Sequence, residues 1–418
     1  MKTLALFILL MPYSFAQDCK IPTELKEVDL RSELGPVRDQ DSVGWCYAFT
    51  AADMLGHYLY KTKNKNLVAS IDARELTKAQ NLISPAAMAI RYNETYKKDF
   101  YESDKAEESP VAEAGNIKKT FELAKENGFC LEKDFPSESF NLVLKKFCVE
   151  QNKCALNLEG LLKLISDRAE ETRDELTKCE LKEILKTTYP SINLSGLENL
   201  IQFTNKKKIF SDLVYLGCTK KFRDPEAIPS VVSEKMEGDW TSLDKALDEG
   251  KIVGISYSPK FLKAPDINEK KSKHASTLVG RHFNKKTCEW EYILRNSYGI
   301  SCDNYKIKNY SKKKITKVKD YRPQAEAKKL ELEKKLQTNS SLDEEEILEI
   351  KDEQRRLDAY LALYSPQMSP ARSYELYIDV VNPGKMRNPR LRCDPVTGYL
   401  FIPKSVLEKN LVKFYYLK

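Results

Sequence analysis

Residues 35–55 of this 418-residue chain read GPVRDQDSVGWCYAFTAADML, a turn-forming segment that runs directly into a predicted helix. Gly35, Pro36 and Gly44 are turn residues. From Cys46 onward the residues favour a helix with an apolar side. Cys46 is therefore expected where a loop becomes a helix. The first N–H groups of a helix carry partial positive charge, so this position favours the thiolate, which is the nucleophilic form of cysteine.

This segment resembles the nucleophile segment of the papain family of cysteine peptidases. The match is Gly44-Trp45-Cys46-Tyr47, with Gln40 standing where the family has its oxyanion-hole glutamine. The resemblance implies an α+β, papain-like two-lobed fold with a helical lobe and a β-rich lobe. It also implies an oxyanion hole made by Gln40 and the backbone N–H of Cys46, with Gly44 and Trp45 at the substrate site. Trp45 replaces a small residue, so it either narrows the cleft or packs on a lobe.

The base that this nucleophile needs is sought among three histidines. His57 lies on the same predicted helix as Cys46, about 16 Å further along its axis at about 1.5 Å per residue, and cannot reach the sulfur. His282 lies in a polar stretch typical of an exposed loop. His274 opens a strand of small residues, where the family places its base, and we predict it as the catalytic histidine. Lys273 beside it either opposes the imidazolium charge or is a solvated surface lysine.

The third catalytic group that the resemblance implies is Asn296, in the segment NSYG at 296–299. The family pattern is Asn-Ser-Trp-Gly, in which the amide orients the imidazole and the aromatic residue shields their hydrogen bond from water. Here Tyr298 stands for the tryptophan. Taken alone, an Asn before Ser and Gly is most often a turn residue. After the Cys46 and His274 motifs, in that order, we predict the catalytic role.

Several local signals predict the elements around these motifs. Ser84 followed by Pro85 predicts a capped helix start, and residues 116–127 predict an amphipathic helix that ends at Gly128. Gly115, just before that helix, stands where the family offers backbone to the substrate. A loop glycine with positive φ explains it equally well.

The resemblance covers roughly half of the chain, in blocks separated by two Lys- and Glu-rich stretches. The second stretch predicts two helices between 324 and 363, whose apolar stripe either packs them together or forms a coiled-coil surface. The expected organisation is a signal peptide at 1–16, a helical lobe at 17–136, a helical insertion at 137–237, a β-rich lobe at 238–302, a charged helical insertion at 303–392 and final strands at 393–418.

The N-terminus predicts export. Met-Lys-Thr precedes the apolar run 4–11, and Ala16 ends a small-residue cleavage site, which is typical of a signal peptide in a secreted or periplasmic protein. The run is too short to span a membrane. No room is expected for an inhibitory propeptide before the Cys46 segment. The ten cysteines then predict disulfides, and Cys302 and Cys393, which flank the second insertion, are predicted to bond to each other.

The charge and composition of the chain limit the classes of partner that are expected. The formal charge of +7 is spread along the chain without a clustered basic face, so no nucleic-acid partner is expected. No Cys-x-x-Cys or histidine pair predicts a metal site, and the implied chemistry needs no cofactor. The partner that the resemblance implies is a peptide or protein substrate. The sequence leaves the oligomeric state open.

The resemblance thus implies a cysteine peptidase that works through a Cys46–His274–Asn296 triad and a thioester. The same chemistry is open to a thiol acyltransferase. A catalytically silent binding protein is the other alternative, which the substitutions at Trp45 and Tyr298 allow. The intact set of catalytic residue types argues against it.

Overall fold

A computed structural model of the chain describes residue 19 and the ranges 25–62, 81–101, 111–138, 158–170, 175–189, 191–203, 208–218, 220–238, 240–264, 271, 273–307, 310–315 and 322–338, most positions of 346–361, and 376–381 and 385–418. The predicted signal peptide lies outside these residues. The chain divides into two compact units, residues 1–300 with 388–418 and residues 301–387. The finer division into lobes and insertions stays a prediction.

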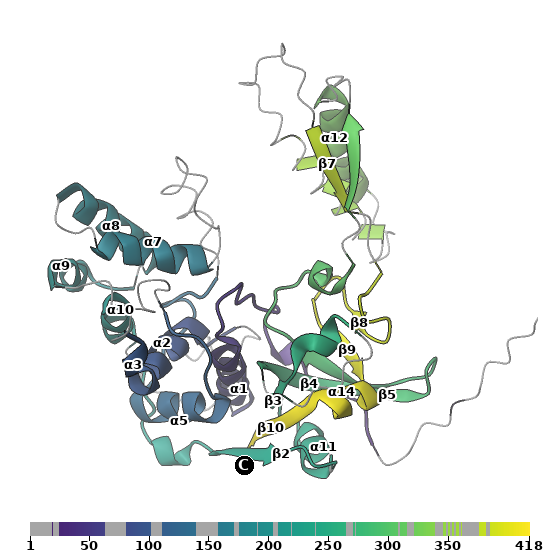
Figure 1. The fold of residues 1–418 in the computed structure, drawn as a ribbon, viewed down its shortest axis with the longest axis horizontal. Helices are drawn as coiled ribbons and strands as arrows, with labels where there is room; N and C mark the ends of the chain where they lie inside the picture. The colour runs from purple at the N-terminus through teal and green to yellow at the C-terminus, as the bar shows by residue number, and fades with distance from the viewer. Residues whose placement is uncertain are drawn as a thin grey trace, which may run out of the picture. The chain divides into compact units, whose positions relative to one another are not determined.

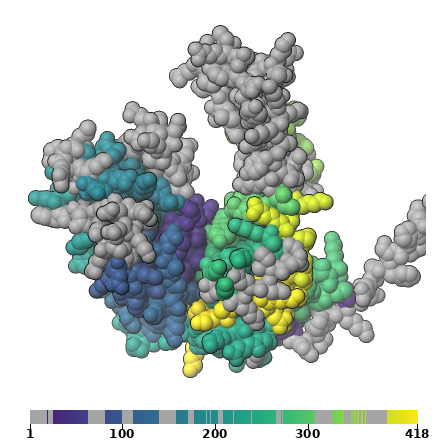
Figure 2. Space-filling model, viewed as in Figure 1, coloured from purple at the N-terminus to yellow at the C-terminus, as the bar shows by residue number. Residues whose placement is uncertain are grey.

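Helix α1 (Cys46–Thr62) runs through the middle of the first unit (Figure 1). Most of its residues are buried, because it contacts helices α2 (Pro85–Tyr96) and α5 (Ile117–Asn127) as well as strands β3 (Val253–Tyr257) and β4 (His274–Asn284). In Figure 2, purple N-terminal residues lie between the blue and teal helical part and the green and yellow part that contains the strands. The helix that begins at Cys46 is thus enclosed by both parts of the unit.

The predicted cap at Ser84 and the predicted helix end at Gly128 are confirmed. Ser84 Oγ accepts the N–H of Ala87 at 3.1 Å and starts α2. Asn116 Oδ1 accepts the N–H of Lys119 at 3.1 Å and starts α5, which ends at Gly128. The other α-helices described in this unit are α3 (Lys98–Tyr101), α7 (Leu158–Glu170), α8 (Glu175–Thr188), α9 (Leu194–Phe203), α10 (Ile209–Gly217), α11 (Thr241–Asp248) and α14 (Lys404–Asn410).

All strands of the main sheet pair antiparallel, in the order β2-β10-β3-β4-β5-β9-β8, with β1 added beside β4. The chain is therefore α+β with an antiparallel sheet. The remaining strands are β1 (Val28–Asp29), β2 (Val231–Lys235), β5 (Glu289–Arg295), β8 (Arg392–Cys393), β9 (Leu400–Pro403) and β10 (Leu411–Leu417).

The expected helical insertion is not helical throughout. The segment 137–237 was predicted to be a helical insertion, and helices α7 to α10 do lie within it. Its end, however, is strand β2, which pairs with β10 at the edge of the main sheet, with Glu234 opposite Phe414. Strand β2 was missed because its partner lies near the far end of the chain, so no local pattern marks the pairing.

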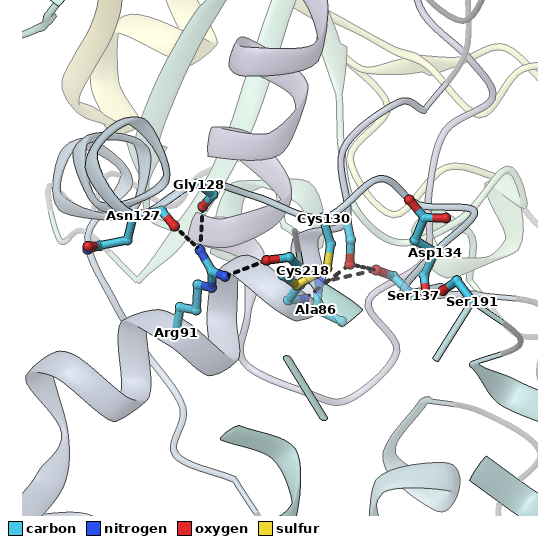
Figure 3. Close-up of a disulfide and its surroundings, with 11 residues drawn as sticks. Ala86, Arg91, Asn127, Gly128, Cys130, Asp134, Ser137, Ser191 and Cys218 are labelled. Atoms are coloured by element: carbon cyan, nitrogen blue, oxygen red, sulfur yellow. Dashed lines mark hydrogen bonds between the residues drawn. A yellow bond between two sulfur atoms is a disulfide. The ribbon is translucent and has the colours of Figure 1, made fainter. Parts of the chain in front are cut away.

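A disulfide and an arginine connect α5 to the end of α10 (Figure 3). Cys130, two residues after Gly128, is bonded to Cys218, with their Cα atoms 4.5 Å apart. The Arg91 guanidinium donates to the carbonyl oxygens of Asn127 (2.7 Å), Gly128 (2.6 Å) and Cys218 (3.2 Å). These bonds attach the later helices to α2 and α5.

Four further cysteines are in disulfides. Cys19 is bonded to Cys288, which connects the N-terminal segment to the β4–β5 turn. Cys302 and Cys393 are both in disulfides, and their bond to each other stays a prediction. Among the described cysteines, Cys46 and the exposed Cys179 are free thiols.

The second unit contains a two-stranded antiparallel sheet, β6 (Tyr310–Ile315) with β7 (Leu376–Val381), that the sequence analysis did not anticipate. Helix α12 (Arg322–Thr338) is the first of the two helices predicted there. Leu332 and Ile350 are buried, and Lys329 pairs with Asp358 at 2.5 Å. These contacts favour packing within the unit over a coiled-coil surface. Among the described helices, none combines the length and apolar character that crossing a bilayer requires.

Candidate active site

The antiparallel pairing of β4 and β5 brings His274 and Asn296 together. His274 is the first residue of β4, and Asn296 directly follows β5, whose last residue Arg295 pairs with Thr277. His274 Nε2 lies 2.7 Å from Asn296 Oδ1, and both side chains are buried. Because the start of one strand meets the end of the next, the two sequence motifs form one site.

The amide of Asn296 is fixed by donors that the sequence analysis missed. Its Oδ1 accepts the backbone N–H of Ser297 at 2.9 Å and the hydroxyl of Ser276 at 3.0 Å. Ser276 Oγ in turn lies 2.9 Å from the hydroxyl of Tyr257. Alternating positions of β4 carry His274 and Ser276, so the period-two pattern of the strand was the signal that placed both on one face.

Gln40 reaches the site because its loop pairs with the segment that follows Asn296. The N–H of Gln40 donates to Ser297 O, and the N–H of Gly299 donates to Arg38 O, both at 2.9 Å. Gly299 has φ +74°, and a Cβ there would lie 2.7 Å from Asp39 Oδ2, so a side chain would break this approach.

The side chain of Gln40 is held in one orientation. Ser297 Oγ donates to Gln40 Oε1 at 2.5 Å, and Gln40 Nε2 donates to Val43 O at 2.8 Å. The second amide hydrogen of Gln40 has no acceptor among the residues that the structure describes. An amide with its oxygen engaged and one N–H remaining suits a donor to a developing oxyanion.

Cys46 lies at the start of α1, as predicted. Burial raises the pKa of its thiol to about 11, and hydrogen bonds from the backbone N–H groups of Ala275, Tyr47 and Cys46 itself act in the opposite direction. Ala275 directly follows His274, so this contact puts the sulfur beside the start of β4. The exposed carboxylate of Glu113 adds a small increase to the same pKa.

The surroundings of His274 also favour its neutral form. Burial lowers the pKa of His274 to about 4, although the hydrogen bond with Asn296 raises it. The Tyr298 ring packs on the imidazole with ring centroids 4.8 Å apart. The Tyr298 hydroxyl lies 3.4 Å from His274 Nδ1. Lys273 is exposed, so the structure favours the solvated reading of that residue.

The segment before α5 lies against the nucleophile loop. Gly44 N donates to Glu113 Oε1 at 3.0 Å, and Ala114 N donates to Gly44 O at 3.1 Å. Gly115 is exposed, and a Cβ there would lie 2.4 Å from the Tyr47 ring. This close approach explains the glycine without a substrate, and its role in substrate binding stays a proposal.

The structure corrects the expected place of Trp45 at the substrate site. Trp45 is fully buried, and its Nε1 donates to Ala112 O at 3.0 Å. Its side chain packs in the core, so it does not line a substrate site. Trp45 fills the interior beside the loop of 112–115.

The other two histidines lie outside the site. His57 is buried and its Nε2 lies 2.8 Å from Glu33 Oε2. His282 is within strand β4, not in a loop, and its Nε2 lies 2.9 Å from Glu291 Oε2. The loop assignment of His282 failed because the polar residues after Gly280 belong to the end of a long strand.

A buried ion cluster lies beneath the site, and the sequence analysis did not include it. Asp53 of α1 pairs with Arg38 Nη2 at 2.6 Å and with Arg295 Nε at 2.9 Å. Arg295 also donates to Tyr399 Oη at 3.0 Å and to Asn81 Oδ1 at 2.7 Å. Asp53, a charged residue in the mostly apolar first part of α1, was the available signal.

No metal centre is indicated where the chain is described, since no group of three or more His, Cys, Asp or Glu side chains there could hold an ion.

The comparisons with known proteins are distant. No family model and no curated protein matches the chain. Among solved structures, a digestive procathepsin L 3 of the Tenebrio molitor larval midgut is 12% identical with a TM-score of 0.35, over 68% of this chain and 65% of that one. Pepw from Lactobacillus rhamnosis HN001 is 11% identical with a TM-score of 0.36, over 94% and 81%. The alignment spans less than two thirds of the procathepsin. At TM-scores below 0.5, neither likeness carries an argument about fold or activity.

Proposed function

We propose that this protein is an exported papain-like cysteine peptidase that hydrolyses peptide bonds through Cys46, His274 and Asn296. The observation that carries the proposal is the 2.7 Å contact between His274 Nε2 and Asn296 Oδ1, together with a free Cys46 thiol at a helix start that is hydrogen-bonded by the backbone of Ala275, the residue after His274. A nucleophile, a base and a group that orients the base are the parts that covalent acyl transfer requires. The disulfides Cys19–Cys288 and Cys130–Cys218 favour an oxidising compartment.

In the first step the Cys46 thiol loses its proton to His274 Nδ1, and the sulfur attacks the carbonyl carbon of the scissile peptide bond. Asn296 Oδ1 accepts a hydrogen bond from His274 Nε2–H throughout, so the imidazole keeps the orientation in which Nδ1 can receive the proton. The C–N bond then breaks, and the imidazolium gives its proton to the leaving amine. The acyl group remains on Cys46 as a thioester.

The carbonyl oxygen becomes an oxyanion in this step. The second Nε2–H of Gln40 and the N–H of Cys46 are the donors proposed to stabilise it. Each such donor is typically worth about 3–4 kcal/mol in the transition state. Ser297, which orients the Gln40 amide, acts as its positioning residue.

In the second step a water molecule attacks the thioester while neutral His274 takes its proton. The C–S bond breaks, and the proton returns to the sulfur, which releases the acid and restores the thiol. Gly44 and Gly115 are the proposed backbone contacts for the peptide. No step requires a cofactor.

One observation favours a second candidate, a catalytically silent binding protein. Burial shifts the pKa of Cys46 upward and the pKa of His274 downward, so both groups are neutral in the resting site. A neutral pair is slower to attack a peptide than a thiolate–imidazolium pair. The two candidates differ in a single measurable property, turnover.

The test is cleavage of a mixed peptide library by the purified exported protein, followed by mass spectrometry. The proposal expects cleavage by the wild type and its loss in Cys46→Ala and His274→Ala. Cys179→Ala, which removes the exposed free thiol of α8, serves as the matched control and should cleave normally. Cleavage that survives Cys46→Ala, or no cleavage by any variant, would overturn the proposal and favour the binding protein.

A further inference from the structure

The proton on the His274 ring can be placed from its neighbours. The backbone N–H of Ser297 can only donate, so the Asn296 atom that it contacts at 2.9 Å is the amide oxygen. That oxygen accepts and cannot donate. His274 Nε2, 2.7 Å from the same oxygen, therefore carries the ring proton. In the neutral imidazole this leaves the lone pair on Nδ1.

The hydroxyl of Tyr298 lies at that lone pair. The Tyr298 Oη to His274 Nδ1 distance is 3.4 Å, and since Nδ1 is the acceptor, the hydroxyl is the donor. Tyr298 is half-buried, and it is close enough to Cys46 that a thiolate there raises the pKa of the phenol, after the larger effect of burial. The hydroxyl thus lies at this nitrogen, within the electrostatic influence of Cys46.

We propose that Tyr298 is a positioning residue whose hydroxyl occupies the accepting lone pair of His274 Nδ1 in the resting site, and so keeps Cys46 as a thiol until the hydroxyl turns aside. The inference rests on the proposed Cys46–His274 pair. When the hydroxyl turns away, the Cys46 S–H bond breaks, its proton passes to Nδ1, and the electron pair stays on sulfur. An aromatic ring without this hydroxyl shields the Asn296 hydrogen bond and leaves Nδ1 open.

Other groups near Cys46 and His274 do not occupy the lone pair of His274 Nδ1. Tyr257 of β3 meets the imidazole edge-on at 5.4 Å between ring centroids, and its hydroxyl contacts Ser276. Glu113 acts on Cys46 only through its charge, from the rim of the site. Tyr298 is the described phenol whose hydroxyl contacts His274 Nδ1.

The test is the rate of iodoacetamide alkylation of Cys46 between pH 5 and pH 9, read by peptide mapping. At pH 6 we expect the Tyr298→Phe variant to react about three- to tenfold faster than the wild type, the factor that one net hydrogen bond supplies. The gain should disappear in the double variant Tyr298→Phe with His274→Ala. Tyr215→Phe makes the same chemical change at an exposed tyrosine and should match the wild type. An unchanged or slower rate in folded Tyr298→Phe would overturn the inference.

A second measurement uses the wild-type protein alone. In ¹⁵N-histidine NMR, with His274 assigned by the His274→Ala variant, we expect a neutral imidazole protonated on Nε2 at pH 7. A doubly protonated imidazolium at that pH would contradict the inference. Neither measurement needs a peptide substrate. If the Tyr298→Phe variant shifts the alkylation profile but the protein cleaves no peptide, the proposed function is rejected and the role of Tyr298 is kept. If the protein cleaves peptides and the profile is unshifted, the role of Tyr298 is rejected and the proposed function is kept.

Discussion

Asp53 pairs with Arg295 at 2.9 Å between Oδ2 and Nε, deep beneath the candidate site. Asp53 lies two turns along α1 from Cys46, and Arg295 directly precedes Asn296. The pair therefore ties the helix that presents the thiol to the strand that presents the amide. Burial raises the pKa of Asp53, but the charges of Arg295 and Arg38 outweigh it and leave that pKa below its ordinary value.

Replacing Asp53 with Asn should destabilise the fold strongly. The change leaves the guanidinium of Arg295 buried without its carboxylate and removes the closer of the two carboxylates at Arg38, and breaking such a buried pair typically costs about 3–5 kcal/mol. Urea unfolding followed by circular dichroism measures the loss. As a control, Glu198→Gln breaks the exposed Lys182–Glu198 pair and should cost less than about 1 kcal/mol. Equal losses in the two variants would contradict the structural role of the cluster.

Removing the oxyanion donor should slow turnover with little effect on the fold. If the proposed function holds, Gln40→Ala should lower kcat by about 10²–10³-fold, the usual effect of losing one such donor. Ser297→Ala frees the Gln40 amide to rotate and should lower kcat by a smaller factor, on the order of tenfold. The assay is hydrolysis of the best peptide from the library. Ser405→Ala, at a surface hydroxyl bound by Arg390, should keep its kcat.

The pH dependence of stability should contain a contribution from Glu132. Its Oε1 accepts the N–H of Ser137, while burial raises the pKa of the carboxyl to about 8. A raised pKa means that folding takes up a proton between about pH 4.5 and pH 8. The stabilisation that the protonated Glu132 carboxyl contributes is complete below its pKa in the unfolded chain, and it is lost as the pH rises through its folded pKa of about 8.

Glu132→Gln should flatten this dependence. For one proton the slope cannot exceed about 1.4 kcal/mol per pH unit. The free energy of unfolding is to be measured in urea at pH 5.5, 7 and 8.5, and the difference between wild type and variant isolates Glu132 from other titrating groups. The exposed Glu126→Gln change should leave the slope unaltered. If Glu132→Gln also leaves it unaltered, the burial argument for Glu132 is wrong.

Breaking the Cys130–Cys218 disulfide should weaken the attachment of helices α7 to α10. The Cys130→Ala, Cys218→Ala double variant should lose about 2–4 kcal/mol of unfolding free energy. Limited proteolysis should then cut first between 139 and 217, since the covalent link between the end of α10 and the residues after α5 is gone. Cys179→Ala, which removes a free thiol, should be as stable as the wild type. A double variant with wild-type stability would contradict the account.

Much of the local structure follows from the sequence. Ser84 and Asn116 act as helix caps, and the small and β-branched residues after His274 form a strand, because capping and strand preference depend on near neighbours. The order of the His274 and Asn296 motifs also anticipates their contact, since two consecutive strands joined by a short turn pair antiparallel.

The rest depends on partners that are distant along the chain. Strand β2 needs β10, and the bonds Cys19–Cys288 and Cys130–Cys218 could not be deduced from spacing alone. The Asp53–Arg295 pair and the contact of Tyr298 with His274 Nδ1 arise from tertiary packing. Trp45 was expected at the substrate site from its place in a motif, with packing on a lobe as the alternative, and its burial favours packing.

The proposed function requires that a substrate acyl group form a thioester with Cys46 while His274 acts as the base. The most direct measurement is an acid quench of the protein during reaction with a peptidyl p-nitrophenyl ester, followed by intact-mass analysis and peptide mapping. The account predicts one acyl group per chain, attached to Cys46 and strongly reduced in His274→Ala. An acyl group on another residue, or none on Cys46 while the ester is consumed, would contradict it.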